Sequence, residues 1–570
     1  MLVLPKGVDL LEANVFPVLY WNYVGLQMNR ISHSLGGPQG GPTMSSRALG
    51  LLHLAMHDAF FAVLGKTEST TDPRTYLPDS IRPSSAGFPS NLANANAALT
   101  GAAITVLDEL YGDGGKGISI LASDTLARSM SKMIGDYDHP IDATGTAHNF
   151  GAKVAKVILQ RLAVKPGDIG ADAGRYEPKQ GPFKFRDEPL HPVRRQAIDP
   201  NDRAKGTRPQ RVYHGPFYGS TVPSFAVTDD DVHTVAKWPE TDYDDALEEV
   251  VRLGGSPQLK STDRSANGTI SGLFWAYDGA NLIGTPPRLY NQILRKIALA
   301  RLGTPDPMNL AQNSDLVRLF ALANVAMADA GKFCWREKYK YELWRPLTGV
   351  RENHTRPSPH DIMIDPFWSA LGAPDTNSNR VAFKPPFPAY PSGHATFGAA
   401  CFQMARLFYR SKETTPSFDV LEPDAIAFTF VSEELDGVSR DLYEVHDPAE
   451  PIENQPGNVR TYVPLTFPSL WAAIFDNAFS RIYLGVHWRF DAADAGDFKE
   501  SDGVTNKDPV QIRYSHVWPR SAGEELPIGG VPLGLGIAND IFTSGMIAPA
   551  AIVVSSSTIG EAKKSLTIYR

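Results

Sequence analysis

The sequence predicts an all-α fold. Apolar residues recur three or four positions apart along most of the 570 residues, which is the spacing of an amphipathic helix. Residues that favour helix N-termini stand directly before several of these runs, namely Ser45–Ser46, Asn313–Asp315 and Ser392. The alternation of apolar and polar residues that is typical of strands is scarce.

The apolar spacing places the helices in two groups, before and after an irregular segment. We expect helices at residues 45–64, 91–111, 123–137, 142–163, 243–254, 264–277, 286–302, 313–345, 393–410, 425–436, 467–483 and 487–497. Residues 164–242 are rich in proline, glycine, arginine and aspartate, and a connection of this length either has a function or wraps around another domain. We therefore divide the chain into an N-terminal helical region with a first bundle (1–163), a wrapping linker (164–242), a C-terminal helical bundle (243–546) and a tail (547–570).

Two short sequence matches occur in the same order in both halves of the chain. Residues 55–59 (AMHDA) resemble residues 326–330 (AMADA), and residues 148–152 (HNFGA) resemble residues 394–399 (HATFGA). Two related helix bundles, of which the first has lost its chemistry, would explain the order of the matches. Chance similarity among alanine-rich helices explains them nearly as well.

The composition excludes several classes of protein. Hydrophobic residues at 42% and charged residues at 21% are ordinary for a soluble globular protein, and a net charge of −8 argues against a nucleic-acid partner. No run of eighteen apolar residues predicts a membrane span, and the N-terminus does not resemble a conventional signal peptide. The two cysteines, Cys334 and Cys401, provide no disulfide framework and are expected to be buried apolar residues.

Three short segments between residues 338 and 491 carry groups that bind a tetrahedral oxyanion. The first segment contains Lys338 and Arg345, followed by Pro346. On one continuous helix the two cations would lie on nearly the same face, about 10 Å apart along the axis, and the proline is expected to end that helix. A solvated basic stripe is the alternative for this segment taken alone.

The second segment is Pro391-Ser392-Gly393-His394, at the start of an apolar run. Ser392 is expected to be the N-cap, so that the N–H groups of Gly393 and His394 lack intrahelical acceptors. A helix N-terminus with free N–H groups and a positive dipole end favours an anion. Taken alone, the segment could equally be an ordinary cap with a surface histidine.

The third segment contains Arg481, His487 and Asp491. Six residues separate the arginine from the histidine, so their side chains would diverge by about 120° on an unbroken helix. We expect the helix to break at Gly485, and a second helix to begin near His487, so that both side chains converge. Asp491 lies one turn after His487, where its carboxylate could hold the imidazole. A core histidine beside a surface ion pair is the alternative.

The three segments together resemble the signatures K-x6-R-P, P-S-G-H and S-R-x5-H-x3-D, which vanadium haloperoxidases share with acid and lipid phosphatases. Residues 16–22, 275–279, 383–390 and 527–533 further resemble the fungal vanadium chloroperoxidases, and this similarity extends over most of the chain. The resemblance implies two four-helix bundles with long irregular connections. It also implies one vanadate, as V(V), at the end of the second bundle.

The resemblance also implies a role for each matching residue. His487 resembles the ligand of vanadium, and His394 and Lys338 resemble the catalytic residues. The vanadate oxygens would be bound by Lys338, Arg345, Ser392, Gly393, His394 and Arg481. Trp335 and Phe387 resemble the aromatic wall of the halide site, and a phenylalanine rather than a histidine at position 387 favours chloride. Asp278 resembles the carboxylate that pairs with the second arginine, here Arg481.

The activity implied by the resemblance is oxidation of chloride, and of bromide, by hydrogen peroxide to hypohalous acid, which then reacts with organic acceptors. The alternative is an acid phosphatase with His487 as nucleophile and His394 as leaving-group acid. A phosphate-binding scaffold without activity would leave two histidines directed at one anion unexplained. Neither a nucleic acid nor a membrane is expected as a partner. The resemblance to exported fungal enzymes implies a soluble, secreted protein.

Overall fold

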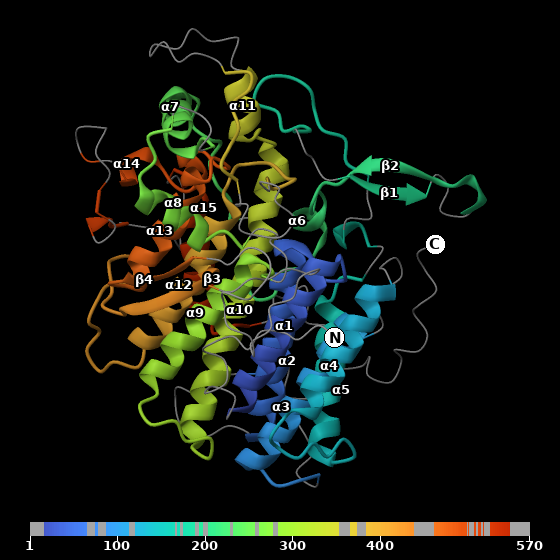
Figure 1. The fold of residues 1–570 in the computed structure, drawn as a ribbon. Helices are drawn as coiled ribbons and strands as arrows, with labels where there is room; N and C mark the ends of the chain where they lie inside the picture. The colour runs from blue at the N-terminus through green and yellow to red at the C-terminus, as the bar shows by residue number, and fades with distance from the viewer. Residues whose placement is uncertain are drawn as a thin grey trace.

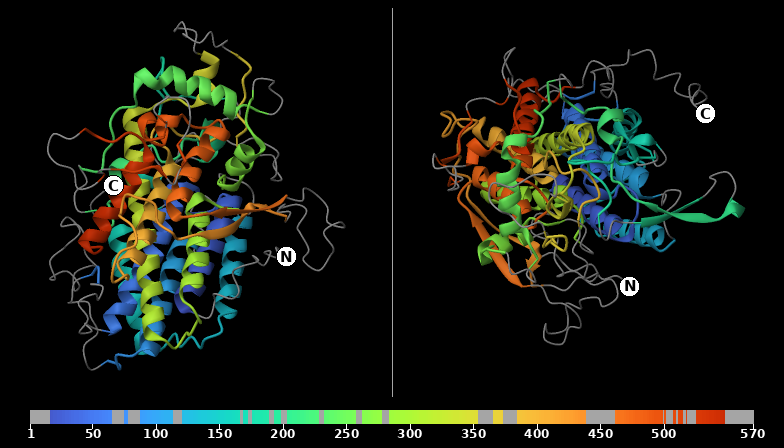
Figure 2. Two further views of the ribbon diagram at one scale, coloured as in Figure 1. Left: turned by 90° about the vertical axis from the view of Figure 1, so that its left-hand side faces the viewer. Right: turned by 90° about the horizontal axis from the view of Figure 1, so that it is seen from above.

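The structure is a computed structural model dominated by long helices that run side by side (Figures 1 and 2). It describes residues 16–64, 75–77, 87–112, 120–165, 168–171, 175–188, 193–197, 203–227, 232–256, 262–277, 283–352, 365–372, 384–437, 461–498, 500, 507–508, 511–514, 517 and 525–547. The N-terminal helices are α1 (Pro17–Leu35), α2 (Gly41–Leu64), α3 (Leu92–Leu107), α4 (Ile120–Gly135) and α5 (Thr146–Leu162). A π-helical turn, Asp108–Gly112, follows α3.

The second half contains the larger set of elements. Between the two groups lie strands β1 (Val193–Ala197) and β2 (Thr207–Arg211), which extend away from the helices, and the short helix α6 (Tyr218–Thr221) (Figure 1). The helices that follow are α7 (Tyr243–Gly254), α8 (Ala266–Phe274), α9 (Pro286–Arg301), α10 (Leu310–Tyr341), α11 (Pro346–Glu352), α12 (Gly393–Arg410), α13 (Leu470–Tyr483), α14 (Ala495–Phe498) and α15 (Gly530–Ser544).

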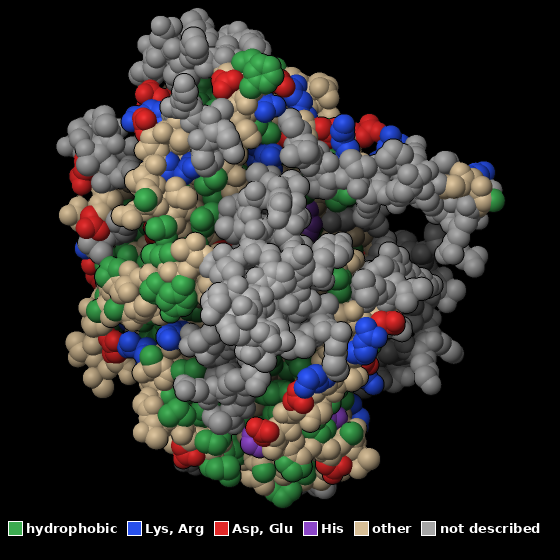
Figure 3. Space-filling model, in the orientation of Figure 1, with side chains coloured by type: hydrophobic (Ala, Val, Ile, Leu, Met, Phe, Trp, Pro, Cys, Tyr) green, Lys and Arg blue, Asp and Glu red, His purple; other side chains and the backbone are tan. Residues whose placement is uncertain are grey.

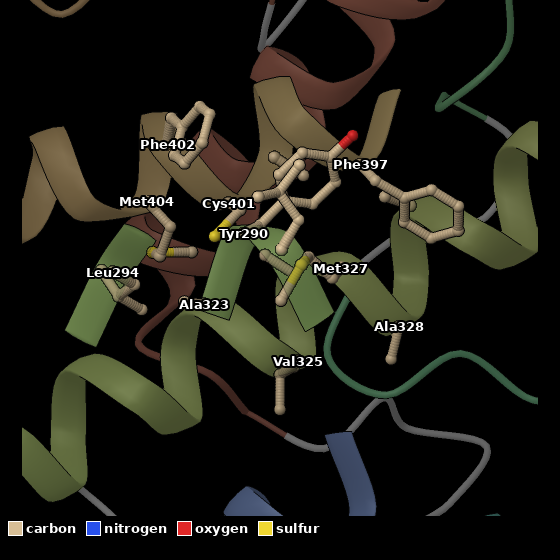
Figure 4. Packing of buried hydrophobic residues seen from close by; sticks show 14 of the residues in the cluster. Tyr290, Leu294, Ala323, Val325, Met327, Ala328, Phe397, Cys401, Phe402 and Met404 are labelled. Carbon is tan, nitrogen blue, oxygen red and sulfur yellow. The ribbon is translucent and has the colours of Figure 1, made fainter. Parts of the chain in front are cut away.

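The core of the molecule is built around α2 and α10, which pack against each other. Among the described residues, α2 is the one helix long and apolar enough to cross a membrane, and 94% of its most apolar window is buried inside the protein. On the other side of α10, apolar side chains from α9, α10 and α12 interlock in one cluster (Figure 4). Cys401 belongs to this cluster, and both cysteines are buried as expected.

The first pair of matching segments, residues 55–59 and 326–330, places one aspartate on each of the two central helices. On α2, the carboxylate of Asp58 accepts hydrogen bonds from the backbone N–H groups of residues 76 and 77, at 2.8 and 2.6 Å. On α10, the carboxylate of Asp329 accepts from those of residues 225, 226 and 227, at 2.6, 2.8 and 3.0 Å. Each aspartate therefore anchors an incoming connection in the same way. The common origin of the two halves stays a prediction.

The prediction of a helix at residues 425–436 is wrong. Residues 428–436 form strand β3, which pairs antiparallel with β4 (Tyr462–Phe467). The start of this segment, Phe428 to Val431, consists of aromatic and β-branched residues, which favour a strand once a partner strand is present. The described residues thus form two two-stranded sheets beside a mostly helical structure.

Four helices were not expected from the sequence, namely α1, α6, α11 and α15. Helix α1 follows Phe16, and α15 has glycine at positions 530, 534 and 536, which lowers its intrinsic helix propensity. These glycines allow close packing, since a Cβ at Gly534 would lie 2.3 Å from the carbonyl oxygen of Thr396 on α12. Tertiary packing against α12 therefore stabilises a helix that its own sequence does not favour.

Helix α10 ends earlier than expected, and the expected role of Pro346 is wrong. The helix ends at Tyr341, Glu342 takes the left-handed conformation with φ 53°, and Pro346 begins α11 instead of ending α10. The linker causes the early end. The Phe185 N–H donates to the Glu342 carbonyl at 2.8 Å, and the Trp344 N–H donates to the Phe183 carbonyl at 3.2 Å. Residues 342–344 are thus held as extended chain.

The break in the third segment occurs where the sequence predicts it. Helix α13 ends at Tyr483, and Gly485 has φ 69°. A Cβ at Gly485 would lie 2.3 Å from the Gly254 carbonyl oxygen, so both the conformation and the space require glycine. The helix expected at residues 487–497 is only partly present. A 3-10 turn, Arg489–Asp491, and the short α14 occupy this stretch.

The described side chains on the face shown in Figure 3 mix acidic, basic and apolar residues. The cations of the three sequence segments do not contribute to this surface, because Lys338, Arg345 and Arg481 are 0%, 1% and 0% exposed. The basic residues that could bind an anion therefore lie inside the protein.

Replacement of Gly485 with alanine is expected to destabilise the protein more than replacement of Gly303, a matched control. Gly303 has φ 71°, and a Cβ there would meet nothing within 4 Å. Gly303→Ala therefore introduces backbone strain alone, about 1–2 kcal/mol, whereas Gly485→Ala adds a clash and is expected to cost about 2–5 kcal/mol. Chemical denaturation of both variants measures the difference. Equal losses would contradict a requirement for close approach at Gly485.

Candidate functional site

The three sequence segments meet around one pocket inside the C-terminal half. The end of α10, the N-terminus of α12 and the end of α13 all contribute to it. Its lining residues are Pro42, Pro286, Trp335, Pro385, Phe387, Gly393, His394, Phe397, Arg481 and His487.

The three cations of the segments are buried together beside the pocket. The Lys338 ammonium donates hydrogen bonds to the carbonyl oxygens of Pro388 and Ala389, at 2.9 and 2.8 Å. Burial, with a further contribution from the nearby cations Arg345 and Arg481, lowers the pKa of Lys338 to about 7. A solvated basic stripe, the alternative for the first segment, is therefore wrong.

Arg345 reaches the site from an extended segment rather than from a helix. Its Nε donates to the Phe387 carbonyl at 2.9 Å, and its Nη1 donates to the Val486 carbonyl at 2.7 Å. The same Nη1 lies 3.0 Å from Nε2 of His487. The arginine thus connects the first and third sequence segments directly, although the common helical face expected for Lys338 and Arg345 does not exist.

The hydrogen bonds of His487 define which of its ring nitrogens carries the proton. Nδ1 lies 2.6 Å from the Asp491 carboxylate, and Nε2 faces a guanidinium that can only donate. Burial, and then the cations Arg345 and Lys338, lower the pKa of His487 well below its ordinary value of 6.5. The imidazole is therefore neutral, with the proton on Nδ1 and a lone pair on Nε2.

Asp491 connects the third segment to the second. Its carboxylate also accepts from the Trp488 N–H at 3.0 Å, and its backbone carbonyl accepts from the Ser392 N–H at 2.8 Å. Burial raises the pKa of Asp491 to about 7, and Lys338 is the largest influence that opposes this shift. Both Arg481 and Asp491 are fully buried, so the alternative of a surface ion pair is wrong.

The second segment forms the expected helix start. Ser392 is the N-cap of α12, and its hydroxyl accepts from the Ala395 N–H at 3.4 Å. Gly393 lies against Trp335, since a Cβ there would be 3.2 Å from the indole ring. Gly393 therefore lines the pocket beside the indole, where the lack of a Cβ leaves room for that ring.

His394 is 6% exposed, so the alternative of a surface histidine is wrong. Its Nε2 lies 3.0 Å from the Ala276 carbonyl oxygen, which can only accept, so Nε2 carries a proton. Its own carbonyl accepts from Tyr290 at 3.2 Å and from Asn477 at 2.8 Å. These contacts fix both the ring and the backbone of His394.

The aromatic pair Trp335 and Phe387 forms one wall of the pocket. Their ring centroids are 4.8 Å apart, and the Lys338 ammonium lies 5.5 and 5.2 Å from them. Such a cation–aromatic arrangement stabilises a buried charge. Asp278, the carboxylate expected to pair with Arg481, lies outside the described residues.

Several residues that line the pocket were not identified from the sequence. Pro42 comes from the start of α2, Pro286 from the start of α9, and Phe397 from the second turn of α12. Ala276 contributes only its carbonyl to His394. Prolines at helix starts are common, so these residues carry no sequence signal that separates a site residue from a structural one.

The donor set fits a multiply charged tetrahedral oxyanion. Of the three buried cations, Arg481 lines the pocket and Lys338 and Arg345 contact residues of its lining, and the helix N-terminus of α12 adds backbone N–H groups. A neutral imidazole with a lone pair on Nε2 is the form of histidine that binds a metal, and the Asp491 contact orients it as metal-bound histidines are oriented. Orthovanadate has the required charge, shape and metal centre.

Two family models and a relative of known type match this chain. Residues 4–223 match the "Vanadium chloroperoxidase N-terminal domain", and residues 318–501 match the "VCPO second helical-bundle domain". The vanadium chloroperoxidase of Curvularia inaequalis is 45% identical, over 95% of this chain and 92% of that protein.

Solved structures share the fold at low sequence identity. The structure of a bacterial vanadium-dependent iodoperoxidase aligns with a TM-score of 0.52 at 15% identity, over 93% of this chain and 97% of that one. A bacterial vanadium-dependent chloroperoxidase in its holo form aligns with a TM-score of 0.50 at 14% identity, over 91% of this chain and 96% of that one. With both of its helical regions matched and 45% identity over nearly its whole length, the chain belongs to the vanadium chloroperoxidase family.

Proposed function

We propose that this protein is a vanadate-dependent haloperoxidase, which uses hydrogen peroxide to oxidise chloride and bromide to hypohalous acid. The observation that carries the proposal is the geometry of His487, whose Nδ1 lies 2.6 Å from the Asp491 carboxylate and whose Nε2 lies 3.0 Å from the Arg345 guanidinium, close to two further buried cations. This combination provides one ligand for a metal and enough positive charge for its oxygens. Membership of the vanadium chloroperoxidase family supports the same activity.

Each residue of the pocket has a distinct task in binding vanadate. His487 is the metal ligand through Nε2, and Asp491 orients it through Nδ1. The oxygens are held by Lys338, Arg345, Ser392, Gly393, His394 and Arg481. When bound by these residues, vanadate would supply a Lewis acid that activates hydrogen peroxide for reaction with a halide.

His394 is the acid–base residue of the proposed reaction. Because Nε2 donates to the Ala276 carbonyl, Nδ1 is the atom that accepts a proton from incoming peroxide and returns it. Lys338 would donate a hydrogen bond to an oxygen of the bound group and so make it more electrophilic. Its ammonium is held by two backbone carbonyls and therefore does not need to reorganise during the reaction.

Trp335 and Phe387 form the proposed halide site. Trp335 and Phe387 are 1% and 7% exposed, so a halide between these rings and the buried cations would be shielded from bulk water. The Lys338 ammonium above both rings attracts the anion. An apolar phenylalanine at position 387 favours chloride as a substrate, and the hypohalous acid formed then reacts with organic acceptors.

The same proposal extends to the architecture and the location of the protein. We assign residues 1–163 and 243–546 to two four-helix bundles, joined by the linker at 164–242, with vanadate at the end of the second bundle. Packing of α2 with α3 and α5, and of α10 with α12 and α15, supports this division. By its resemblance to exported fungal enzymes, the protein is proposed to be secreted.

Addition of vanadate to the vanadate-free protein is expected to switch on halide oxidation. The same cage and the same Nε2 lone pair suit a histidine-nucleophile phosphatase, so the vanadate-free protein is also expected to hydrolyse an activated phosphate ester. Vanadate should abolish that hydrolysis with the same dissociation constant with which it activates chloride oxidation. A phosphatase that vanadate inhibits without any gain of halide oxidation would contradict the peroxidase proposal.

Two single substitutions are expected to separate vanadate binding from catalysis. His487→Ala removes the metal ligand and should abolish retention of vanadium after gel filtration, measured by elemental analysis. His394→Ala removes the acid–base residue and should lower kcat for bromide and chloride about 10²–10⁴-fold, while vanadium is retained. Full vanadium retention by His487→Ala, or unchanged turnover by His394→Ala, would show that the corresponding role is misassigned.

A further inference from the structure

Against the aromatic wall lies His214, a linker residue outside all three sequence segments. We infer that His214, together with Thr43, is a positioning residue that determines halide specificity by holding Trp335 and Phe387 at their separation. The inference rests on the proposed haloperoxidase function. It assigns to the linker and to the N-terminal half a role in substrate choice.

The backbone of His214 holds both sides of the wall. Its carbonyl accepts from Nε1 of Trp335 at 3.1 Å and from the Tyr339 hydroxyl at 2.8 Å. Its N–H donates to the Pro386 carbonyl at 3.1 Å, directly before Phe387. A single residue is therefore bonded to the indole on α10 and to the loop that carries the phenyl ring.

The side chain of His214 packs against both rings. Its ring centroid lies 5.8 Å from that of Trp335, nearly perpendicular at 85°, and 5.9 Å from that of Phe387. Its Nε2 lies 2.9 Å from the hydroxyl of Thr43, a residue of α2 that is 1% exposed. The imidazole is thus anchored to the N-terminal half of the chain.

Little space is left for movement around this imidazole. A Cβ at Gly41 would lie 2.2 Å from the His214 ring, and a Cβ at Gly215 would lie 2.6 Å from the Trp335 indole. Both glycines have positive φ, 73° and 64°. The chain therefore passes as closely as glycine allows on both sides, which keeps the His214 ring and the indole in fixed positions.

On its other side, the loop that carries Phe387 is held by two of the buried cations. Arg345 donates to the Phe387 carbonyl, and Lys338 donates to the carbonyls of Pro388 and Ala389. These bonds involve backbone atoms and do not depend on the His214 ring. Loss of that ring should therefore loosen the aromatic side chains while the positions of the cations, and hence vanadate affinity, are kept.

Chloride should respond more strongly than bromide to a loosened wall. Chloride is the smaller and more strongly hydrated ion, so it loses more hydration free energy on entering the pocket, and it is also harder to oxidise. A close-packed dry wall is needed to exclude water around it. Bromide is larger and easier to desolvate, and it tolerates a wider and wetter site.

The test compares His214→Ala, Thr43→Val and Thr43→Ser with the wild-type enzyme, all loaded with vanadate. We expect His214→Ala to raise KM for chloride about tenfold, with less than a twofold change for bromide and for the vanadate dissociation constant. Thr43→Val should give a smaller change in the same direction, because the imidazole loses its anchor. Thr43→Ser keeps the hydroxyl and should therefore have the wild-type KM for both halides. His148→Ala, a partly buried histidine of α5, is the control for general destabilisation.

A second measurement follows the wall without turnover. With 5-fluorotryptophan incorporated, the ¹⁹F resonance of Trp335, assigned with Trp335→Phe, should shift in His214→Ala and Thr43→Val and stay in place in His148→Ala. Equal KM changes for both halides, parallel loss of vanadate affinity, or an unmoved Trp335 resonance would overturn the inference. A wild-type protein that oxidises no halide with vanadate would instead reject the proposed function.

Discussion

The site depends on the burial of three cations in the interior of an acidic protein. Lys338, Arg345 and Arg481 are each at most 1% exposed. A buried charge costs several kcal/mol unless dipoles, hydrogen bonds or opposite charges compensate it. Backbone carbonyls compensate the charges of Lys338 and Arg345 in part. The nearby Asp491 carboxylate compensates a further part of the positive charge. A multiply charged anion bound in the pocket, as proposed, would supply the remaining compensation.

Much of the local fold follows from this requirement. The linker ends α10 at Tyr341 and places Arg345 on extended chain, from which its guanidinium reaches both the Phe387 carbonyl and His487. Gly485, with its positive φ, breaks the helix between Arg481 and His487. Lys338 and Arg345 are bonded to carbonyls of residues 387–389, the loop that also carries one ring of the aromatic wall. The two cations and the aromatic wall are therefore built as one unit.

The chemistry of the site was easier to predict from the sequence than its geometry. The three segments, the N-cap at Ser392 and the break at Gly485 follow from local rules of capping and backbone conformation. The end of α10, the role of Pro346 and strand β3 do not, because each depends on a partner distant in sequence. The same holds for Pro42, Thr43 and His214, which reach the site only through packing of the N-terminal half and the linker.

The central claim is that the lone pair of His487 Nε2 and the three buried cations bind one vanadate. A crystal structure of the protein soaked with vanadate tests this most directly. The claim predicts a vanadium atom at covalent bonding distance from His487 Nε2, with its oxygens within hydrogen-bonding distance of Lys338, Arg345 and Arg481. Vanadium bound to another side chain, or a pocket without vanadium at saturating vanadate, would contradict it.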